Sequence, residues 1–297
     1  MKLGYIPPMT KGLTLDRDYV IRLAEMLESQ GVESLWTVEH VVMARNYDPL
    51  YPYSKDGMAP TAPDTLMPDP LEWHAFVAAR TDRILLGTSV VIASQHSAAI
   101  LAKRVATLDA LSGGRLRLGV GIGWQREEYE AVGVPYRDRG RRLDETIEAM
   151  RILWRDEWAT YHGKHVNFEN VHMDTKPFHP EGVPILIGGS TDVAARRAGR
   201  LGDGWYPYVI SPEDFGTGVE TIREVAKAAG RDPSRIEITV WPASFDFTKT
   251  FDLPFVKSYV DRGAERLVVS QGESMTTDIQ GQRDFVRRYQ DQVVAKL

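Results

Sequence analysis

The residues best suited to chemistry stand directly after short apolar runs. Trp36-Thr37-Val38-Glu39-His40 ends one such run and sets an imidazole beside a carboxylate. Histidine can orient a ligand or transfer a proton near neutral pH, and the neighbouring carboxylate could orient the ring. This makes His40 the leading catalytic candidate, with Glu39 beside it. The same position would also suit a histidine that only caps the strand or stacks on Trp36, so residue types alone leave both interpretations open.

A glycine pair in Ile187-Gly188-Gly189-Ser190-Thr191 is the second candidate site. Unobstructed backbone N–H groups, a hydroxyl and a following helix N-terminus favour phosphate binding. A tight turn that needs positive φ would select the same glycines. A third feature, Gly119-x-Gly121-x-Gly123, lacks the spacing of a dinucleotide loop. Glycine at every second position is expected either to keep a strand face bare for a flat ring or to allow close packing of strands.

Metal and thiol chemistry find little support. The chain has no cysteine, which excludes a thiolate nucleophile and a cysteine-based zinc site. Four histidines between residues 160 and 184, namely His162, His165, His172 and His179, lie among turn residues in an irregular segment, which does not suit a metal cluster. The first apolar run, Gly4-Tyr5-Ile6-Pro7-Pro8, lacks the His-x-His that metal-dependent hydrolases often carry there. We therefore predict no metal site, and a metal-dependent hydrolase is disfavoured.

Charge and hydropathy narrow the class of partner. The formal net charge of −5 leaves no basic stripe for a nucleic-acid backbone. No segment approaches the ~20 apolar residues of a membrane span. The chain is expected to be a cytoplasmic protein that acts on a small molecule, without nucleic-acid or membrane partners.

The elements that must position these residues alternate between short apolar runs and longer amphipathic segments. Expected strands are Lys2 to Ile6, Ser34 to Thr37, Ile84 to Val91, Leu116 to Gly121, Pro184 to Ile187, Trp205 to Tyr208, Ile236 to Trp241 and Arg266 to Ser270. Helical periodicity fits Asp16 to Gln30, Leu71 to Arg80, Ser97 to Leu111, Arg142 to Trp154, Asp192 to Leu201, Pro212 to Ala229, Pro254 to Arg262 and Ile279 to Ala295.

Eight such repeats within 297 residues predict an α/β fold, a single (β/α)8 TIM barrel domain over residues 1–297. A doubly wound open sheet is the competing architecture. Two segments without periodicity interrupt the pattern as insertion loops: Ala44 to Pro70 after the second strand, and Thr160 to Pro184 before the fifth. A long loop in a compact domain is commonly a lid or a binding loop. In a TIM barrel the functional residues follow the strands, which is where the candidates above stand.

Four segments carry a resemblance to a known family. Ser34 to His40, Thr81 to Thr88, Leu108 to Arg115 and Ala198 to Trp205 resemble, in the same order, the luciferase-like superfamily. The resemblance runs from Gly4 to about Tyr208 and is weak beyond Ser211. Members of that family use FMN for monooxygenation or coenzyme F420 for hydride transfer, on a TIM barrel that holds the cofactor ring over the strand ends.

The resemblance implies a role for each candidate. Glu39-His40 matches an acidic-His pair that touches the deazaflavin ring in the F420 branch, and Ser89-Val90 matches a non-proline cis peptide that supports the ring. Gly188, Gly189 and Ser190 match the phosphate loop. The loop beside the ring and its ribityl chain is matched by the segment that contains Gly123, Trp124, Glu127 and Tyr129.

One departure concerns the substrate. Sugar-phosphate dehydrogenases of the F420 branch carry a glutamate directly after the Gly-x-Gly of the fourth strand, where this chain has Trp124. Trp36, Trp124, Tyr206 and Tyr208, which are expected near the mouth of the barrel, instead suggest an apolar or aromatic pocket. The resemblance thus predicts an F420-dependent oxidoreductase that exchanges a hydride with a small, apolar carbonyl, alcohol or activated alkene.

Two alternatives stay open. One is an FMN-dependent monooxygenase, which would need a flavin reductase as partner, and the other is a flavin-binding protein without turnover. Family members are commonly dimers, so by analogy a homodimer is expected.

Overall fold

Eight parallel strands close into a barrel in the computed structural model of this chain, which describes residues 1–62 and 64–297. Around the barrel they run in the order β1 (Lys2–Ile6), β10 (Arg266–Ser270), β9 (Glu237–Val240), β8 (Gly204–Tyr206), β7 (Ile185–Gly188), β4 (Leu116–Val120), β3 (Leu85–Thr88) and β2 (Ser34–Thr37). The predicted (β/α)8 barrel is confirmed, and the open sheet is wrong because β1 pairs with both β2 and β10.

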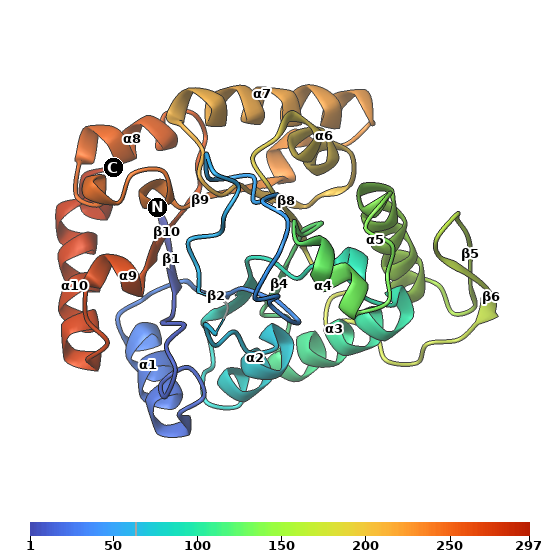
Figure 1. The fold of residues 1–297 in the computed structure, drawn as a ribbon, viewed down its shortest axis with the longest axis horizontal. Coiled ribbons are helices and arrows are strands. Elements are labelled where there is room, and N and C mark those ends of the chain that lie inside the picture. The colour runs from blue at the N-terminus through green and yellow to red at the C-terminus, as the bar shows by residue number, and fades with distance from the viewer. Residues whose placement is uncertain (63) are drawn as a thin grey trace.

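Helices surround the strands as an outer ring, seen end-on in Figure 1. They are α1 (Arg17–Ser29), α2 (Pro70–Ala78), α3 (Ala98–Ser112), α4 (Arg126–Ala131), α5 (Arg139–Arg155), α6 (Asp192–Leu201), α7 (Pro212–Ala228), α8 (Leu253–Val260), α9 (Gln271–Ser274) and α10 (Ile279–Gln292). Side-chain caps define several starts: Asp16 accepts a hydrogen bond from the Tyr19 backbone N–H at 2.7 Å, at the beginning of α1.

The predicted elements all form, with a few corrections at their ends. The strand expected from Ile84 to Val91 is shorter, since the chain leaves the sheet after Thr88. The strand expected from Trp205 to Tyr208 ends at Tyr206. Two short helices were missed: α4 lies in the segment expected to be a loop from Trp124 to Tyr129, and α9 directly follows β10.

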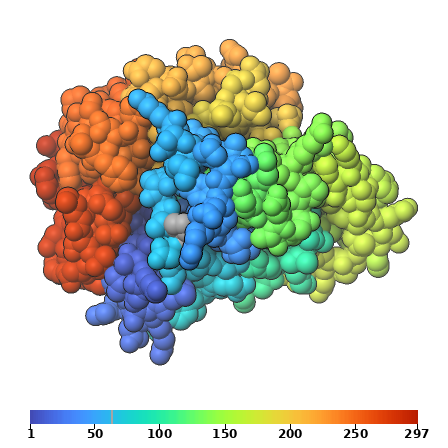
Figure 2. Space-filling model, viewed as in Figure 1, coloured from blue at the N-terminus to red at the C-terminus, as the bar shows by residue number. Residues whose placement is uncertain are grey.

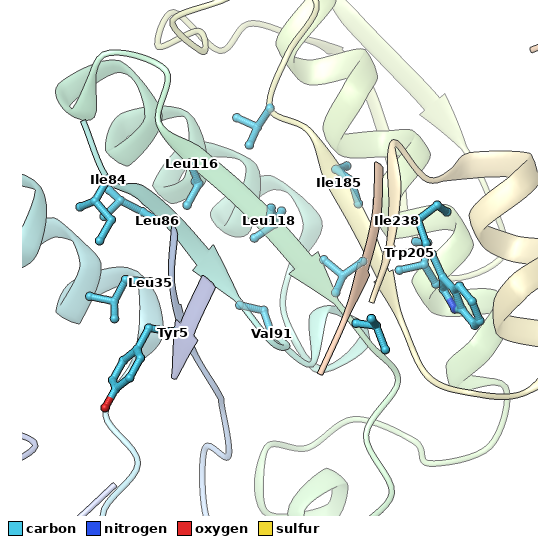
Figure 3. Close-up of a cluster of buried hydrophobic side chains, with 14 of the residues drawn as sticks. Tyr5, Leu35, Ile84, Leu86, Val91, Leu116, Leu118, Ile185, Trp205 and Ile238 are labelled. Atoms are coloured by element: carbon cyan, nitrogen blue, oxygen red, sulfur yellow. The ribbon is translucent and has the colours of Figure 1, made fainter. Parts of the chain in front are cut away.

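The hydrophobic core lies in two layers because neighbouring strand residues face opposite sides of the sheet. Side chains from Tyr5, Leu35, Leu118 and other strand positions form one cluster with helix residues such as Leu23. Figure 3 shows this layer following the strands around the barrel. It packs the longer helices, among them α1, α3 and α7, against the sheet and so fixes the strand ends that carry the candidate site.

A smaller cluster fills the barrel interior, with Trp36 at its centre beside Tyr206. The Trp36 indole is fully buried and donates to the Ser34 hydroxyl at 2.8 Å. A Cβ at Gly87 would lie 2.3 Å from the indole, and one at Gly4 would lie 2.6 Å from its nitrogen. These glycines are needed for space. The expectation that Trp36 lies at the mouth is therefore wrong, since it fills the barrel beneath.

Both predicted insertions are present. Residues 38–69, here called the β2 loop, contain no helix or strand among their described members and cross the centre of the view in Figure 1. Pro63, which belongs to the predicted insertion, lies outside the described residues. In Figure 2 the loop covers the centre of this face. The second insertion is an antiparallel hairpin, β5 (Ala159–His162) and β6 (Asn167–Val171), that projects from the side of the barrel.

Among the residues that the structure describes, no helix is both long and apolar enough to cross a membrane. Within the same residues, no three histidine or carboxylate side chains come together as ligands for a metal ion.

Glu273 connects α9 to the carboxyl end of the barrel through hydrogen bonds. Its carboxylate accepts hydrogen bonds from the Ser270 backbone N–H at 2.7 Å, the Trp241 indole at 2.8 Å and the Thr250 hydroxyl at 3.0 Å. Burial raises the pKa of Glu273 to about 7, and the three hydrogen bonds only partly oppose this shift.

The raised pKa predicts a pH-dependent stability. Because the folded chain holds the Glu273 proton more tightly than the unfolded chain does, folding loses free energy as the pH rises from the unfolded pKa of about 4.5 through about 7. Glu273→Gln keeps the acceptor oxygen without the charge. As the pH rises from 4.5 to 8, the free energy of unfolding of this variant should increase by up to ~3 kcal/mol relative to that of the wild type. Urea unfolding at both pH values measures the difference, and a pH-independent difference would contradict the assignment.

Candidate active site

A cavity of about 460 Å³ opens at the carboxyl ends of the barrel strands, beneath the β2 loop. This is the face where TIM barrels carry their functional residues, and the volume suits a small organic molecule. The lining includes Ile6, Met9, Glu39, His40, Met43, Tyr51, Tyr53, Met67, Ser89, Val90, Ile92, Gly123, Trp124, Gly188, Gly189, Tyr206, Tyr208, Trp241 and Phe247. Most of the candidate residues are thus brought together.

His40 has a fixed orientation in this pocket. Its Nδ1 lies 3.0 Å from Oε2 of Glu128, which is fully buried in α4. The other oxygen of Glu128 accepts the Val41 backbone N–H at 2.7 Å. A carboxylate can only accept, so Nδ1 carries a proton and Nε2 is the ring nitrogen left for a bound molecule. His40 does not stack on Trp36; its ring packs edge-on against Trp124 at 5.8 Å.

Glu39 has other partners than His40. Its carboxylate accepts the Ile92 backbone N–H at 2.7 Å and lies 3.1 Å from Nε2 of His96. The expectation that Glu39 orients the imidazole of His40 is therefore wrong, because Glu128 does so. Glu39 instead holds the segment that follows β3. Sequence reasoning missed both Glu128 and His96.

The segment after β3 crosses the pocket wall at a cis peptide between Ser89 and Val90, as predicted. Val90 occupies space that two glycines leave open. A Cβ at Gly121 would lie 2.6 Å from the Val90 side chain, and one at Gly188 would also lie 2.6 Å away. A Cβ at Gly119 would instead lie 1.9 Å from the Thr88 carbonyl oxygen of the neighbouring strand. These glycines thus serve close packing, which is the second of the two interpretations that the sequence allowed.

Of the residues predicted in the segment after β4, some line the pocket and others lie behind it. Gly123 and Trp124 line the pocket. Tyr129 is fully buried behind it, where its hydroxyl donates to the Ile122 carbonyl at 2.5 Å, and burial raises its pKa to about 12. Glu127 lies outside the lining and accepts the Asp48 backbone N–H at 2.9 Å. Tyr129 and Glu127 therefore support the pocket and the β2 loop from behind.

The glycine turn after β7 reaches the pocket through Gly188 and Gly189. Gly189 has φ +104, so it needs the freedom of glycine. Thr191 caps the following helix α6 by accepting the Ala194 backbone N–H at 3.3 Å. The Ser190 hydroxyl donates to the Tyr208 carbonyl and accepts the Tyr208 backbone N–H. The turn therefore offers backbone groups and a helix N-terminus to a ligand. The Ser190 hydroxyl proton is already donated to the Tyr208 carbonyl.

Aromatic rings in edge-to-face and tilted contacts span the mouth of the barrel. Tyr51 lies 5.2 Å from Trp124 and 5.5 Å from Tyr53, which lies 5.0 Å from Tyr208. Tyr208 continues to Trp241 at 5.8 Å. We call these five residues the aromatic arch. Such contacts at 4.5–7 Å are favourable, so the arch holds the β2 loop over the pocket.

The pocket has little charge. Within the part of the chain that the structure describes, no lysine or arginine lines it, and Glu39 is its one carboxylate. The uncharged lining side chains are mostly apolar or aromatic. The arrangement can bind a flat, largely uncharged ring, and His40 is its one imidazole, oriented from behind.

Comparisons with known proteins agree with this architecture. A family model described as luciferase-like monooxygenase matches residues 3–245. An uncharacterized protein of Mycobacterium tuberculosis is 31% identical over 269 residues, which cover 91% of this chain and 88% of the relative. A protein of Kineococcus radiotolerans named F420-dependent glucose-6-phosphate dehydrogenase is 33% identical over 223 residues, covering 73% of this chain and 60% of the relative.

Solved structures show the same fold at low sequence identity. The monooxygenase RslO1 from Streptomyces bottropensis is 22% identical, with a TM-score of 0.76 over 100% of this chain and 99% of its own. The coenzyme F420 dependent tetrahydromethanopterin reductase from Methanopyrus kandleri is 17% identical, with a TM-score of 0.74 over 99% of both chains.

The contact between Val90 and the glycines predicts a compensating pair of substitutions. Gly121→Ala forces Val90 out of its place, so we expect a loss of about 1–3 kcal/mol in the free energy of unfolding. In a Val90→Ala background the added methyl has room, and most of that loss should disappear. Urea unfolding of the two single variants and the double variant measures the coupling. Additive effects would mean that the two side chains do not compete for space.

Proposed function

This chain belongs to the luciferase-like monooxygenase family, and from that premise we propose that it is a coenzyme F420-dependent oxidoreductase. Its reaction would be the transfer of a hydride between the deazaflavin and a small, apolar carbonyl, alcohol or activated alkene. One observation carries the proposal: His40, oriented by the buried Glu128, and the Gly188-Gly189 turn open into the same nearly uncharged pocket.

The pocket residues fit such a cofactor. Ser89 and Val90 form one wall of the pocket against which a flat ring could lie, and Gly123 adds a surface without a side chain. The Gly188-Gly189 turn would hold the phosphate at the N-terminus of α6. When bound, the deazaflavin would supply two-electron hydride chemistry, while the protein positions the reactants.

His40 would act through Nε2. Because Glu128 holds Nδ1, the free nitrogen can accept a proton from a substrate hydroxyl or return one to a substrate oxygen. It could also orient the ring by a hydrogen bond. Trp124 packs against the imidazole and limits its rotation. The pair of Glu128 and His40 thus provides a positioned proton carrier at the mouth of the barrel.

The substrate is proposed to be neutral and apolar. The related protein from Kineococcus radiotolerans is named for a sugar phosphate, yet no lysine or arginine in the described lining of this pocket could pair with a second phosphate. Trp124 stands where the resemblance would place a catalytic glutamate. Met9, Met43 and Met67 add flexible apolar surface that adapts to varied shapes.

An FMN-dependent monooxygenase with a flavin reductase partner is the second candidate, favoured by the description of the matching family. A flavin-binding protein without turnover is less well supported, because it would have no use for an oriented His40. We also propose a homodimer in the cytoplasm, by analogy with the family.

Cofactor binding tests the first proposal. The phosphate of FMN is a monoester with nearly two negative charges, whereas the phosphate that coenzyme F420 would place at the turn is a diester with one. Because no cationic side chain belongs to the described lining, the turn should favour the phosphate group with the lower charge. We expect F420 to bind at least tenfold more tightly than FMN, about 1.4 kcal/mol, in fluorescence titrations at one salt concentration. Tighter FMN binding with oxygen-dependent turnover would establish the monooxygenase instead.

Removal of the imidazole tests its role. His40→Ala should lower hydride-transfer turnover by roughly 10²-fold or more while the barrel stays folded. Glu128→Gln should also lower turnover, because the imidazole loses its orienting charge. His179→Ala is the matched control, since this exposed histidine packs against Phe178 and lies outside the pocket lining. Turnover is followed by deazaflavin absorbance. Full turnover in His40→Ala with unchanged cofactor affinity would make His40 a structural residue.

A further inference from the structure

Tyr53 brings a hydroxyl from the β2 loop to the glycine turn after β7. Tyr53 and Gly189 line the same pocket. The ring of Tyr53 packs edge-on against Tyr208 at 5.0 Å, and Tyr208 is the residue whose backbone binds the Ser190 hydroxyl. The shared pocket lining and the ring contact with Tyr208 therefore place Tyr53 next to the turn that would bind an anion.

The turn itself is short of donors for an anion. The single proton of the Ser190 hydroxyl is donated to the Tyr208 carbonyl. Thr191 lies outside the pocket lining and caps α6. No lysine or arginine lines the described pocket. Backbone N–H groups remain, and a further donor must come from another segment.

Tyr53 can be that donor. Burial raises the pKa of Tyr53, so its hydroxyl keeps its proton at neutral pH. Its ring is held between Tyr51 and Tyr208 in the aromatic arch, which limits the freedom that it would lose on binding a ligand. A neutral donor fixed in this way can bind a phosphate oxygen without the desolvation cost of a buried cation.

We propose that Tyr53 donates a hydrogen bond to the phosphate group of the bound cofactor at the turn formed by Gly188, Gly189 and Ser190. This rests on the proposed function, which brings a phosphate-bearing cofactor to the pocket. It adds a ligand from the β2 loop to a site that otherwise belongs to the barrel. Because the β2 loop also covers the pocket, cofactor binding and the position of the loop are coupled through one side chain.

Tyr53→Phe removes the hydroxyl and keeps the ring. The probes are coenzyme F420 and the deazaflavin riboside that lacks its phosphate and tail. Binding of F420 should weaken about tenfold or more, the loss expected when a hydrogen bond to a charged group is removed. Binding of the riboside should change less than twofold. Tyr47→Phe is the control, because it removes a hydroxyl from the same loop at a position outside the pocket lining.

Equal losses for both probes, or no loss for F420, would overturn the role of Tyr53. The riboside also reports whether the variant keeps a folded pocket. If the wild type binds neither deazaflavin, the proposed function itself fails. FMN and riboflavin then form the matching pair, and the same tenfold contrast for FMN alone would support Tyr53 as a phosphate ligand in a flavin enzyme.

Discussion

The limited space inside a closed eight-stranded barrel governs this structure. Only some inward positions can carry large side chains, because those of facing strands meet at the axis. Here Trp36 fills the centre and Val90 fills the rim. Gly4 and Gly87 stand beside the indole, and Gly121 and Gly188 stand beside the valine. Adding a methyl group at such contacts costs about 1–3 kcal/mol, which makes these glycines part of the packing.

The candidate site inherits its rigidity from this packing. Val90 fixes the segment after β3, and Glu39 holds the next part of that segment through the Ile92 N–H and His96. Glu128 then orients His40 from a fully buried position in α4. Each polar contact connects two strand-end segments far apart in the sequence. Glu128 therefore fixes the first residues of the β2 loop, which carry His40, and leaves the later part of the loop for ligand recognition.

The sequence predicted the barrel well because every strand and most helices have strong local signals. Apolar runs and helical periodicity are local, and so are caps such as Asp16. The sequence did not predict which side chains are hydrogen-bonded to each other. Glu39 and His40 are adjacent, which suggested a pair, yet successive side chains of an extended backbone point in different directions. His40 meets Glu128, 88 residues away. No local pattern separates Glu128 from Glu127, since only the turn of α4 decides which carboxylate faces inward.

The charge of the pocket connects its architecture with its ligands. A phosphate without a cationic side chain must be stabilised by N–H groups, by a helix N-terminus and by hydroxyl groups, all of them dipoles. Dipoles give less free energy per contact than a paired charge, so they discriminate against a second negative charge on the ligand. Under the proposed function, a lining that accepts the phosphodiester of the cofactor would therefore disfavour a phosphorylated substrate beside it. The methionines and the aromatic arch would then favour a small, apolar substrate whose reacting group reaches His40.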